Sequence, residues 1–216
     1  MYDALMAMVD GFKNDDLKKI VSEIYSDNRM CLLYWPAAYR LHHAVRGGLL
    51  MHTLSIVRLA QSVCDIYPFV DRDMLIAGAM LHDIAKLQEF SVSETGIADG
   101  YSVAGNLVGH IAMGAITIEK YAERLNTNRE TAILLQHMIL SHHGEPEFGA
   151  AVRPMTIEAE MLSELDLLDS RLYEMREAVI SANTGDFSQR VWALDNRKLY
   201  NHGRVDLNND PELFKK

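Results

Sequence analysis

Apolar residues recur along most of the chain at the spacing of three and four residues that is typical of an amphipathic helix. Between residues 15 and 25, one stripe consists of Leu17, Ile20, Val21 and Ile24. The side chain of Asn14 or Asp15 can accept hydrogen bonds from the first free N–H groups of this segment. The pattern therefore predicts a helix over 15–25 that buries one face.

The same spacing predicts further helices over nearly the whole chain. They cover 49–67, 72–87, 106–125, 128–143 and 156–183, with a last short helix around 189–194. The segment 72–87 is apolar on nearly every side, which is expected of a helix at the centre of a bundle. Between Ser91 and Val103 the pattern alternates and contains two glycines, so at most a small β-hairpin is expected there. We predict an all-α fold, a helical bundle with this one insertion.

Length and composition fit one globular domain. The chain has 216 residues, of which 49% are hydrophobic and 24% are charged. A chain of this length buries roughly 70% of the surface that it exposes when unfolded. The sequence contains no internal repeat. We predict a single domain over residues 1–216, with its core at about 15–200.

The net charge of −9 bears on the class of partner. Proteins that hold long nucleic acids usually present a basic stripe, because binding neutralises phosphates. Here the basic residues are scattered, and the densest cluster is Arg197, Lys198 and Arg204. We therefore expect no broad nucleic-acid surface, whereas the excess of carboxylates fits a site for divalent cations.

Features of the sequence also bear on location. The first residues include an acid and no basic cluster, unlike a signal peptide. Cys31 and Cys64 lie far apart without a CxxC spacing, which fits free thiols in a reducing compartment. No apolar run approaches the ~18 residues that a membrane span needs. We expect a cytoplasmic protein without a membrane partner.

Ionisable side chains occupy positions where the helical pattern favours apolar ones. They lie in five separate apolar segments and are His52, His82, Asp83, His110, His142, His143 and Asp166. A single residue of this kind is more often a hydrogen-bonded core residue or a solvent-exposed residue than a metal ligand. Burying them all is costly unless they find partners. A bound dication offsets these costs together, because it balances the carboxylates and uses the imidazole lone pairs. We predict that these side chains converge on metal.

The order of these residues resembles a known family. His52, the pair His82-Asp83 within LHDIAK, and Asp166 resemble the H…HD…D signature of the HD-domain metal-dependent phosphohydrolases. More narrowly, five stretches are similar, in this order, to the catalytic domain of the YhaM-type bacterial 3′→5′ exoribonucleases: HHAVRGGLLMHT, AGAMLHDIAK, GNLVGHI, LLQHMILSHHG and ALDNR. The resemblance runs from about Leu17 to Tyr200 and implies an HD-domain helical bundle.

The resemblance also implies a set of ligands. A first metal ion would be bound by His52, His82, Asp83 and Asp166. Asp83 would bridge to a second ion, which would be completed by His110 and by His142, His143 or both. Whether one ion or two are bound stays open. A mixed nitrogen and oxygen shell without thiolates suits Mn²⁺, Fe²⁺, Ni²⁺ or Mg²⁺ better than a structural zinc site.

Residues near the predicted ligands are candidates for catalysis and substrate binding. Lys86 follows the HD pair by one helical turn, so we predict that it projects to the same face and binds a substrate phosphate. Asp83 and Lys86 are the predicted catalytic residues. His43 and Arg46 precede a pair of glycines and are predicted to line the substrate entrance.

Three further residues are given supporting roles. Asp169 is predicted to orient a metal ligand through a hydrogen bond, as carboxylates near metal sites commonly do. His42 and His137 are interpreted as structural.

Together these features predict an enzyme, a divalent-metal-dependent phosphohydrolase that acts on a nucleotide or a short oligonucleotide. A 3′→5′ exoribonuclease-like activity is one alternative. A cyclic-dinucleotide phosphodiesterase is another, although the segment after His143 reads GEPEFG and lacks the GYP tripeptide of those enzymes. A non-catalytic signalling module would be expected to have lost ligands, and a di-iron oxygenase is a minor alternative. A homo-oligomer is compatible with the sequence.

The size of the substrate is a separate expectation. The nucleases that the chain resembles carry an OB-fold domain ahead of the HD domain, and no all-β segment precedes Leu17 in this sequence. We therefore expect a phosphorylated small molecule or a short oligonucleotide to be a better substrate than long RNA.

Overall fold

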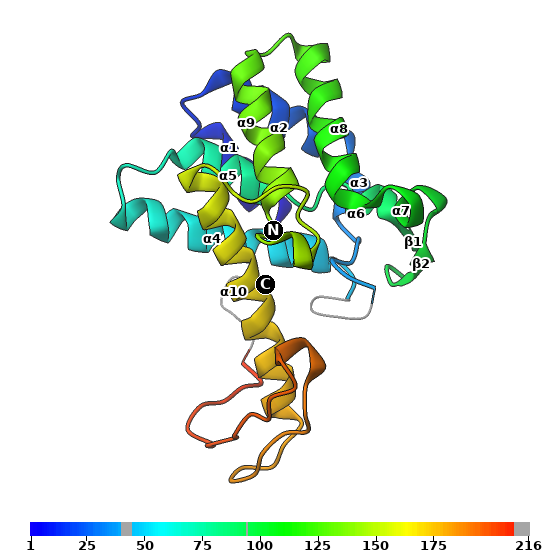
Figure 1. Cartoon of the computed structure of the whole chain (residues 1–216), viewed down its shortest axis with the longest axis vertical. Coiled ribbons are helices and arrows are strands. Elements are labelled where there is room, and N and C mark those ends of the chain that lie inside the picture. The colour runs from blue at the N-terminus through cyan, green and yellow to red at the C-terminus, as the bar shows by residue number, and fades with distance from the viewer. Residues whose placement is uncertain (40–44, 94, 210–216) are drawn as a thin grey trace.

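The computed structural model describes residues 1–39, 45–93 and 95–209 and shows a helical bundle with one small hairpin (Figure 1). In chain order the elements are α1 (Tyr2–Asp10), α2 (Asp15–Asp27), α3 (Arg29–Leu32), α4 (Gly48–Ile66), α5 (Arg72–Leu81), α6 (Lys86–Glu89), β1 (Phe90–Val92), β2 (Ala98–Tyr101), α7 (Val103–Leu107), α8 (Gly109–Leu125), α9 (Arg129–Ser141), the 3₁₀ helix η1 (Pro146–Phe148), α10 (Ile157–Ile180) and the 3₁₀ helix η2 (Trp192–Leu194). The predicted all-α fold is confirmed.

Helix α2 follows directly from its sequence. The side chain of Asn14 accepts hydrogen bonds from the backbone nitrogens of Asp16, at 3.0 Å, and Leu17, at 3.1 Å. These N–H groups have no partner inside the helix, so the cap stabilises its first turn. The predicted apolar stripe is completely buried. It places α2 against α5 and α8.

Helix α5 lies at the centre of the bundle. Every residue from Met74 to Leu81 is buried, and the helix packs against α2, α4, α9 and α10. It ends at Leu81, so the expected helix over 72–87 was too long. After Leu81 the backbone bonds change to a three-residue spacing, from Ile84 N to Leu81 O at 3.1 Å, and a turn separates α5 from α6. The HD pair therefore lies in a turn at the end of the central helix.

The predicted hairpin is present as β1 and β2. The two strands are antiparallel, with Phe90 opposite Tyr101. Downstream, Gly109 adopts a φ of +76°, which only glycine reaches without strain, and this conformation turns the chain into α8. The turn brings the first residues of α8 next to the end of α6.

Helix α10 links the bundle to the end of the chain. Thr156 caps its first turn, and the helix contacts α4, α5 and α9. Its second half extends away from the bundle (Figure 1). The following residues fold back along it, with isolated bridges between Phe187 and Tyr200 and between Val191 and Arg197. We call residues 171–204 the C-terminal lobe.

Among the helices of the described residues, α4 is long and apolar enough to cross a membrane by length and composition alone. It packs against α5 and α10 and carries the buried His52. Core helices of globular proteins pass the same test, so α4 is weak evidence for a membrane span.

Candidate metal centre

Side chains from five helical segments meet beside the end of α5. The structure brings together all seven side chains that the sequence predicted as metal ligands, from α4, the turn after α5, α8, the turn after α9, and α10: His52, His82, Asp83, His110, His142, His143 and Asp166. Within the described part of the chain their donor atoms fall into two neighbouring groups. Either group could hold a divalent ion.

The first group surrounds His52. Its Nε2 lies 3.3 Å from His82 Nε2, 3.1 Å from Asp166 Oδ1 and 3.7 Å from Asp83 Oδ2. Adjacent ligands in an octahedral shell lie about 3 Å apart when each is about 2.1 Å from the ion. These four donors are therefore close to the spacing that one ion imposes.

The second group consists of His110, His142 and His143, whose donor atoms all lie within 4.8 Å of one another. His110 lies in the first turn of α8, and the other two lie in the turn after α9. Three imidazole nitrogens this close together can share one ion.

Asp83 lies between the two groups. Its Oδ2 is 3.3 Å from His82 Nε2, whereas its Oδ1 is 3.6 Å from His110 Nε2 and 3.9 Å from His142 Nε2. One carboxylate therefore presents an oxygen to each group, the arrangement expected of a ligand that bridges two ions.

In each of the five imidazoles, Nδ1 makes a hydrogen bond that fixes the orientation of the ring. His82, His142 and His143 donate from Nδ1 to the carbonyls of Ala79, Ile139 and Phe148, at 2.9, 2.7 and 3.1 Å. His52 and His110 instead use carboxylates, with Nδ1 at 2.8 Å from Asp169 Oδ2 and 2.9 Å from Glu89 Oε1. A carbonyl accepts and cannot donate, so Nδ1 carries the proton in these three rings, and in the neutral form of each the Nε2 lone pair is free for a metal.

Two of these nitrogens need a partner that the described residues do not supply. Nε2 of His110 and of His142 is buried and makes no hydrogen bond among those residues. A buried polar atom without a partner is costly. Burial lowers the pKa of both His142 and His143, which keeps these rings neutral. A neutral imidazole with a buried, unused lone pair fits a metal ligand.

In the first group, burial and the neighbouring charged side chains have opposite effects on the pKa values. Burial disfavours the charged form of His52, but hydrogen bonds to Asp166 and Asp169 outweigh it and raise its pKa to about 9. Burial also opposes the charge on Asp83, yet the nearby Lys86 and His82 hold the pKa of its carboxyl well below the usual value. The site thus keeps its carboxylates ionised, and a cation at His52 Nε2 would replace the proton there.

A cavity of about 230 Å³ opens onto this centre. It is lined by Asp83, Lys86, His142, His143, Phe148, Ser163, Asp166, Leu167 and Ser170. Lys86 Nζ lies 2.7 Å from Asp83 Oδ2, and Trp35 donates to the Lys86 carbonyl at 2.8 Å. The cavity can therefore admit a phosphate against one ammonium group and the predicted metal ligands.

The other predicted residues have mixed positions. Asp169 bonds to His52, the contact that the sequence predicted for it. His137 accepts a hydrogen bond from Met155 N at 2.9 Å, in keeping with a structural role. Arg46 is exposed near Gly96 and, among the described residues, is not part of the cavity lining. His42 and His43 lie outside the described residues.

Sequence reasoning missed Glu89. This buried carboxylate accepts two hydrogen bonds from His110, one from the backbone nitrogen and one from Nδ1. It therefore caps the start of α8 and orients a predicted ligand at once. The local pattern gives little signal for it, because an acid is ordinary at the end of a helical segment such as LHDIAKLQE.

Comparison with known proteins gives matches over most of the chain. The sequence model of the HD domain family matches residues 49–171. The chain is 41% identical over 202 residues to the 3′-5′ exoribonuclease YhaM of Bacillus licheniformis, 40% over 203 to that of Listeria innocua and 37% over 200 to that of Bacillus subtilis. These alignments cover 93% of this chain but 63% of each relative, so the chain spans less than two thirds of their length. No solved structure matches the chain.

Proposed function

Because the chain belongs to the HD domain family, we propose that it is a divalent-metal-dependent phosphohydrolase that cleaves phosphodiester bonds in short oligonucleotides. The curated relatives carry the name 3′-5′ exoribonuclease, and we propose the same direction of attack here, with the terminal 3′ nucleotide in the cavity. Since the chain spans only part of those relatives, both substrate and direction are proposals for this chain.

The observation that carries the proposal is the position of Asp83 between two groups of imidazoles. We propose that His52, His82 and Asp166 hold one ion with Asp83 Oδ2, and that His110, His142 and His143 hold a second with Asp83 Oδ1. The mixed nitrogen and oxygen donors favour Mn²⁺, Fe²⁺, Ni²⁺ or Mg²⁺. When bound, such ions neutralise phosphate oxygens and acidify the water that attacks phosphorus.

The protein's own side chains have separate tasks in this reaction. Lys86 binds a phosphate oxygen at the cavity wall and offsets the charge of Asp83, from which it is 2.7 Å away. Asp169 and Glu89 hold the rings of His52 and His110. The contacts to the two rings and the contact between Lys86 and Asp83 fix the geometry of the site before the substrate arrives, and such preorganisation is the source of much of an enzyme's rate enhancement.

The test uses protein stripped of metal with a chelator. A 5′-labelled pentaribonucleotide is incubated with this protein and with Mn²⁺, Mg²⁺, Ni²⁺ or Fe²⁺ in turn, and the products are resolved by size. We expect no cleavage without metal and stepwise shortening from the 3′ end with at least one ion. A cyclic dinucleotide and a mononucleotide are run in parallel. Failure of all four ions to support cleavage of the RNA would overturn the proposal.

The state of the cysteines bears on the cellular compartment of the protein. Cys31 and Cys64 are both free thiols, as expected in a reducing compartment, and we propose the cytoplasm.

A further inference from the structure

A second cavity continues from the metal centre along α10. It has a volume of about 260 Å³ and shares Phe148, Leu167 and Ser170 with the lining of the first. Its far wall is formed by Arg171 on α10 and by Ala193 and Leu194 in η2. Glu174 and Asp195 complete its lining, and we call this second cavity, bounded by these eight residues, the α10 groove. The shared residues show that the groove adjoins the cavity at the metal centre.

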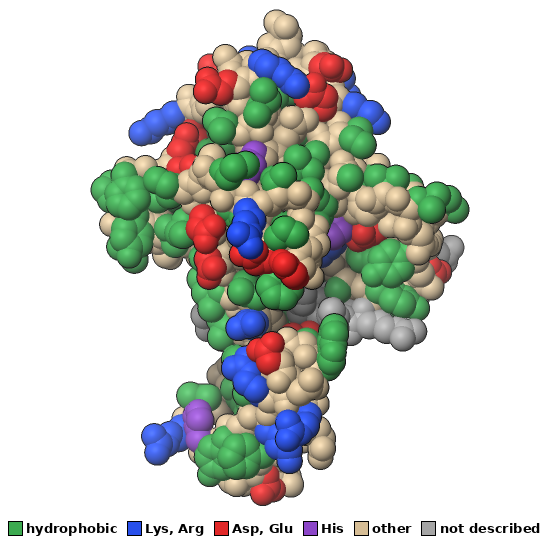
Figure 2. All heavy atoms as spheres, in the orientation of Figure 1, with side chains coloured by type: hydrophobic (Ala, Val, Ile, Leu, Met, Phe, Trp, Pro, Cys, Tyr) green, Lys and Arg blue, Asp and Glu red, His purple; other side chains and the backbone are tan. Residues whose placement is uncertain are grey.

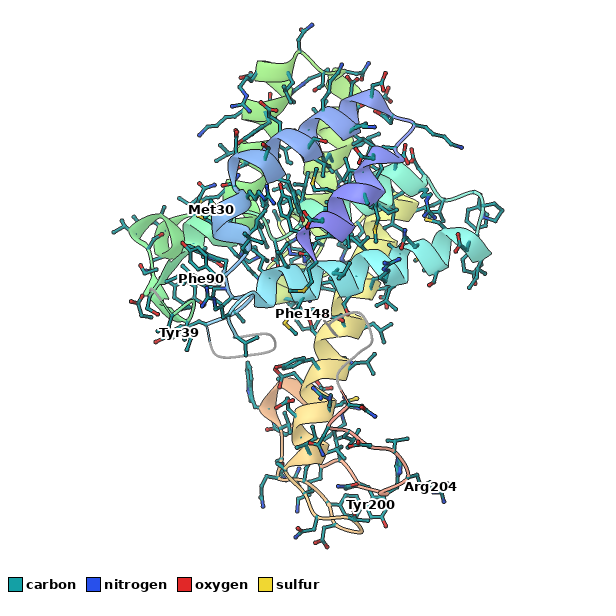
Figure 3. The ribbon with its side chains drawn as sticks, turned by 180° about the vertical axis from the view of Figure 1, so that it is seen from behind. Met30, Tyr39, Phe90, Phe148, Tyr200 and Arg204 are labelled. Carbon is teal, nitrogen blue, oxygen red and sulfur yellow. The ribbon has the colours of Figure 1, made fainter. Side chains whose placement is uncertain are left out.

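An exposed aromatic ring stands where the two cavities join. Phe148 is 74% exposed and lies beside α10 near the point where the helix leaves the bundle (Figure 3). Its backbone is fixed, because its carbonyl accepts the hydrogen bond from His143 at 3.1 Å. An aromatic ring held at the mouth of a site is a platform on which a nucleic-acid base can stack, a contact that tolerates any base.

The charge of the C-terminal lobe differs from that of the rest of the chain. Residues 171–204 contain six Lys and Arg against four Asp and Glu, a net charge of +2 in a chain of net charge −9. Figure 2 shows basic side chains, with some acidic ones among them, on the visible face of the lobe. The lobe therefore repels a phosphate chain less than the net charge of the whole chain would suggest.

Within the lobe, Arg171 is the cation that lines the groove. It lies 3.8 Å from Asp195, and Arg197 lies 3.6 Å from the same carboxylate. Two guanidinium groups therefore share Asp195, which lines the groove together with Glu174. Exposed ion pairs of this kind contribute little, so Arg171 can turn to a phosphate at small cost.

We propose that the α10 groove binds the nucleotides on the 5′ side of the scissile phosphate in a single-stranded oligoribonucleotide. A base stacks on Phe148, and Arg171 binds a phosphate further along. This inference rests on the proposed function, since it assumes that the 3′ end lies at the metal centre. It limits the contacts to a few nucleotides, because the groove ends at η2.

The test compares substrates of increasing length. kcat/KM is measured with Mn²⁺ for oligoribonucleotides from two to about six nucleotides long, with the wild-type chain and with Phe148→Ala and Arg171→Ala. Phe69→Ala and Arg72→Ala are matched controls, because Phe69 is 70% exposed and Arg72 forms an exposed ion pair with Asp65 at 3.5 Å. Circular dichroism checks that all variants are folded.

We expect the wild-type kcat/KM to rise over the first added nucleotides and then level off. In each groove variant it falls about tenfold for the pentanucleotide, the size of one lost stacking or phosphate contact, and by less for the dinucleotide. The inference is overturned if the wild type cleaves RNA but the groove variants lose no more than the controls, or if the losses do not depend on length. If the wild type cleaves no oligonucleotide with any metal, it is the proposed function that fails.

Discussion

Glu89 Oε1 accepts two hydrogen bonds from a single residue, His110: one from its backbone nitrogen at 3.0 Å and one from its Nδ1 at 2.9 Å. The first holds the start of α8, where helix N–H groups have no internal partner. The second holds the ring so that Nε2 faces the metal centre. Burial opposes the charge on Glu89, but the bonds to His110 lower its pKa, so it stays an acceptor.

We predict that Glu89→Ala weakens Mn²⁺ binding about 10- to 100-fold, the usual cost of losing a side chain that orients a metal ligand. Isothermal titration with Mn²⁺ measures this, and we expect the loss in one class of sites if two ions bind. Glu130→Ala, an exposed acid in the first turn of α9, is the matched control. Equal Mn²⁺ affinity in the two variants would show that Glu89 does not support the site.

Asp83→Ala should reduce hydrolysis of bis-p-nitrophenyl phosphate to the level of a blank. The substitution removes the carboxylate that faces both groups of imidazoles, so both ions lose a ligand. Activity and bound metal are measured together, with Asp99→Ala on β2 as an exposed control. A folded Asp83→Ala variant that hydrolyses the substrate like the wild type would place catalysis elsewhere.

Gly105→Ala should destabilise the protein by about 1–3 kcal/mol, because the added methyl group would overlap the carbonyl of Glu89. The overlap is with backbone, which cannot rotate away as a side chain would. Urea unfolding measures the loss, and Gly100→Ala, whose new methyl group meets no atom within 4 Å, is the control. Since the clash moves Glu89, Mn²⁺ affinity should fall as well. Unchanged stability would contradict the close approach of α7 to α6.

A pH-dependent contribution to stability is expected where α2 meets α8. Asp27 accepts hydrogen bonds from Tyr121 at 2.8 Å and Arg124 at 3.1 Å, and these bonds lower its pKa. A carboxyl whose pKa is lower in the folded state stabilises that state above its unfolded pKa of about 3.9. This contribution is lost as the pH falls through the folded value.

Asp27→Asn should therefore unfold at a lower urea concentration than the wild type at pH 7, and the difference should shrink in acid. The effect is small, because the site is exposed to solvent. Asp99→Asn supplies the baseline for loss of one exposed charge. A difference that persists unchanged down to pH 2 would show that the hydrogen bonds to the ionised carboxylate are not its source.

Most residues of the centre could be found from the sequence because each breaks a helical pattern locally. His52 stands out within an apolar helix, and no knowledge of its partners is needed to see that it is costly there. Asp166 lies in a helix with several other acids, and it was singled out by the H…HD…D signature. Glu89 escaped notice because it ends its helix, where an acid is ordinary. Its role arises only when α6 packs beside α8.

The limits of helices and the shape of the cavity depend on packing that a linear pattern does not contain. The apolar run continues past Leu81, so periodicity extended the central helix through the HD pair. In the structure, the hydrogen bond from the His82 ring to the Ala79 carbonyl and the turn that follows end the helix at Leu81. Likewise, the α10 groove joins η1, α10 and η2, which are far apart in sequence. The cluster of Arg197, Lys198 and Arg204 was visible in the sequence, but its position relative to the groove was not.

The groups that accept hydrogen bonds from Nδ1 of the five imidazoles differ in how easily a mutation can remove them. His82, His142 and His143 donate to main-chain carbonyls, which every residue type supplies, so no substitution at Ala79, Ile139 or Phe148 deletes the acceptor itself. His52 and His110 depend on side chains. Apart from mutations of the ligands themselves, the mutations that remove an acceptor from these rings are therefore those at Asp169 and Glu89. A deep mutational scan would show these two carboxylates nearly as intolerant as the histidines that they hold.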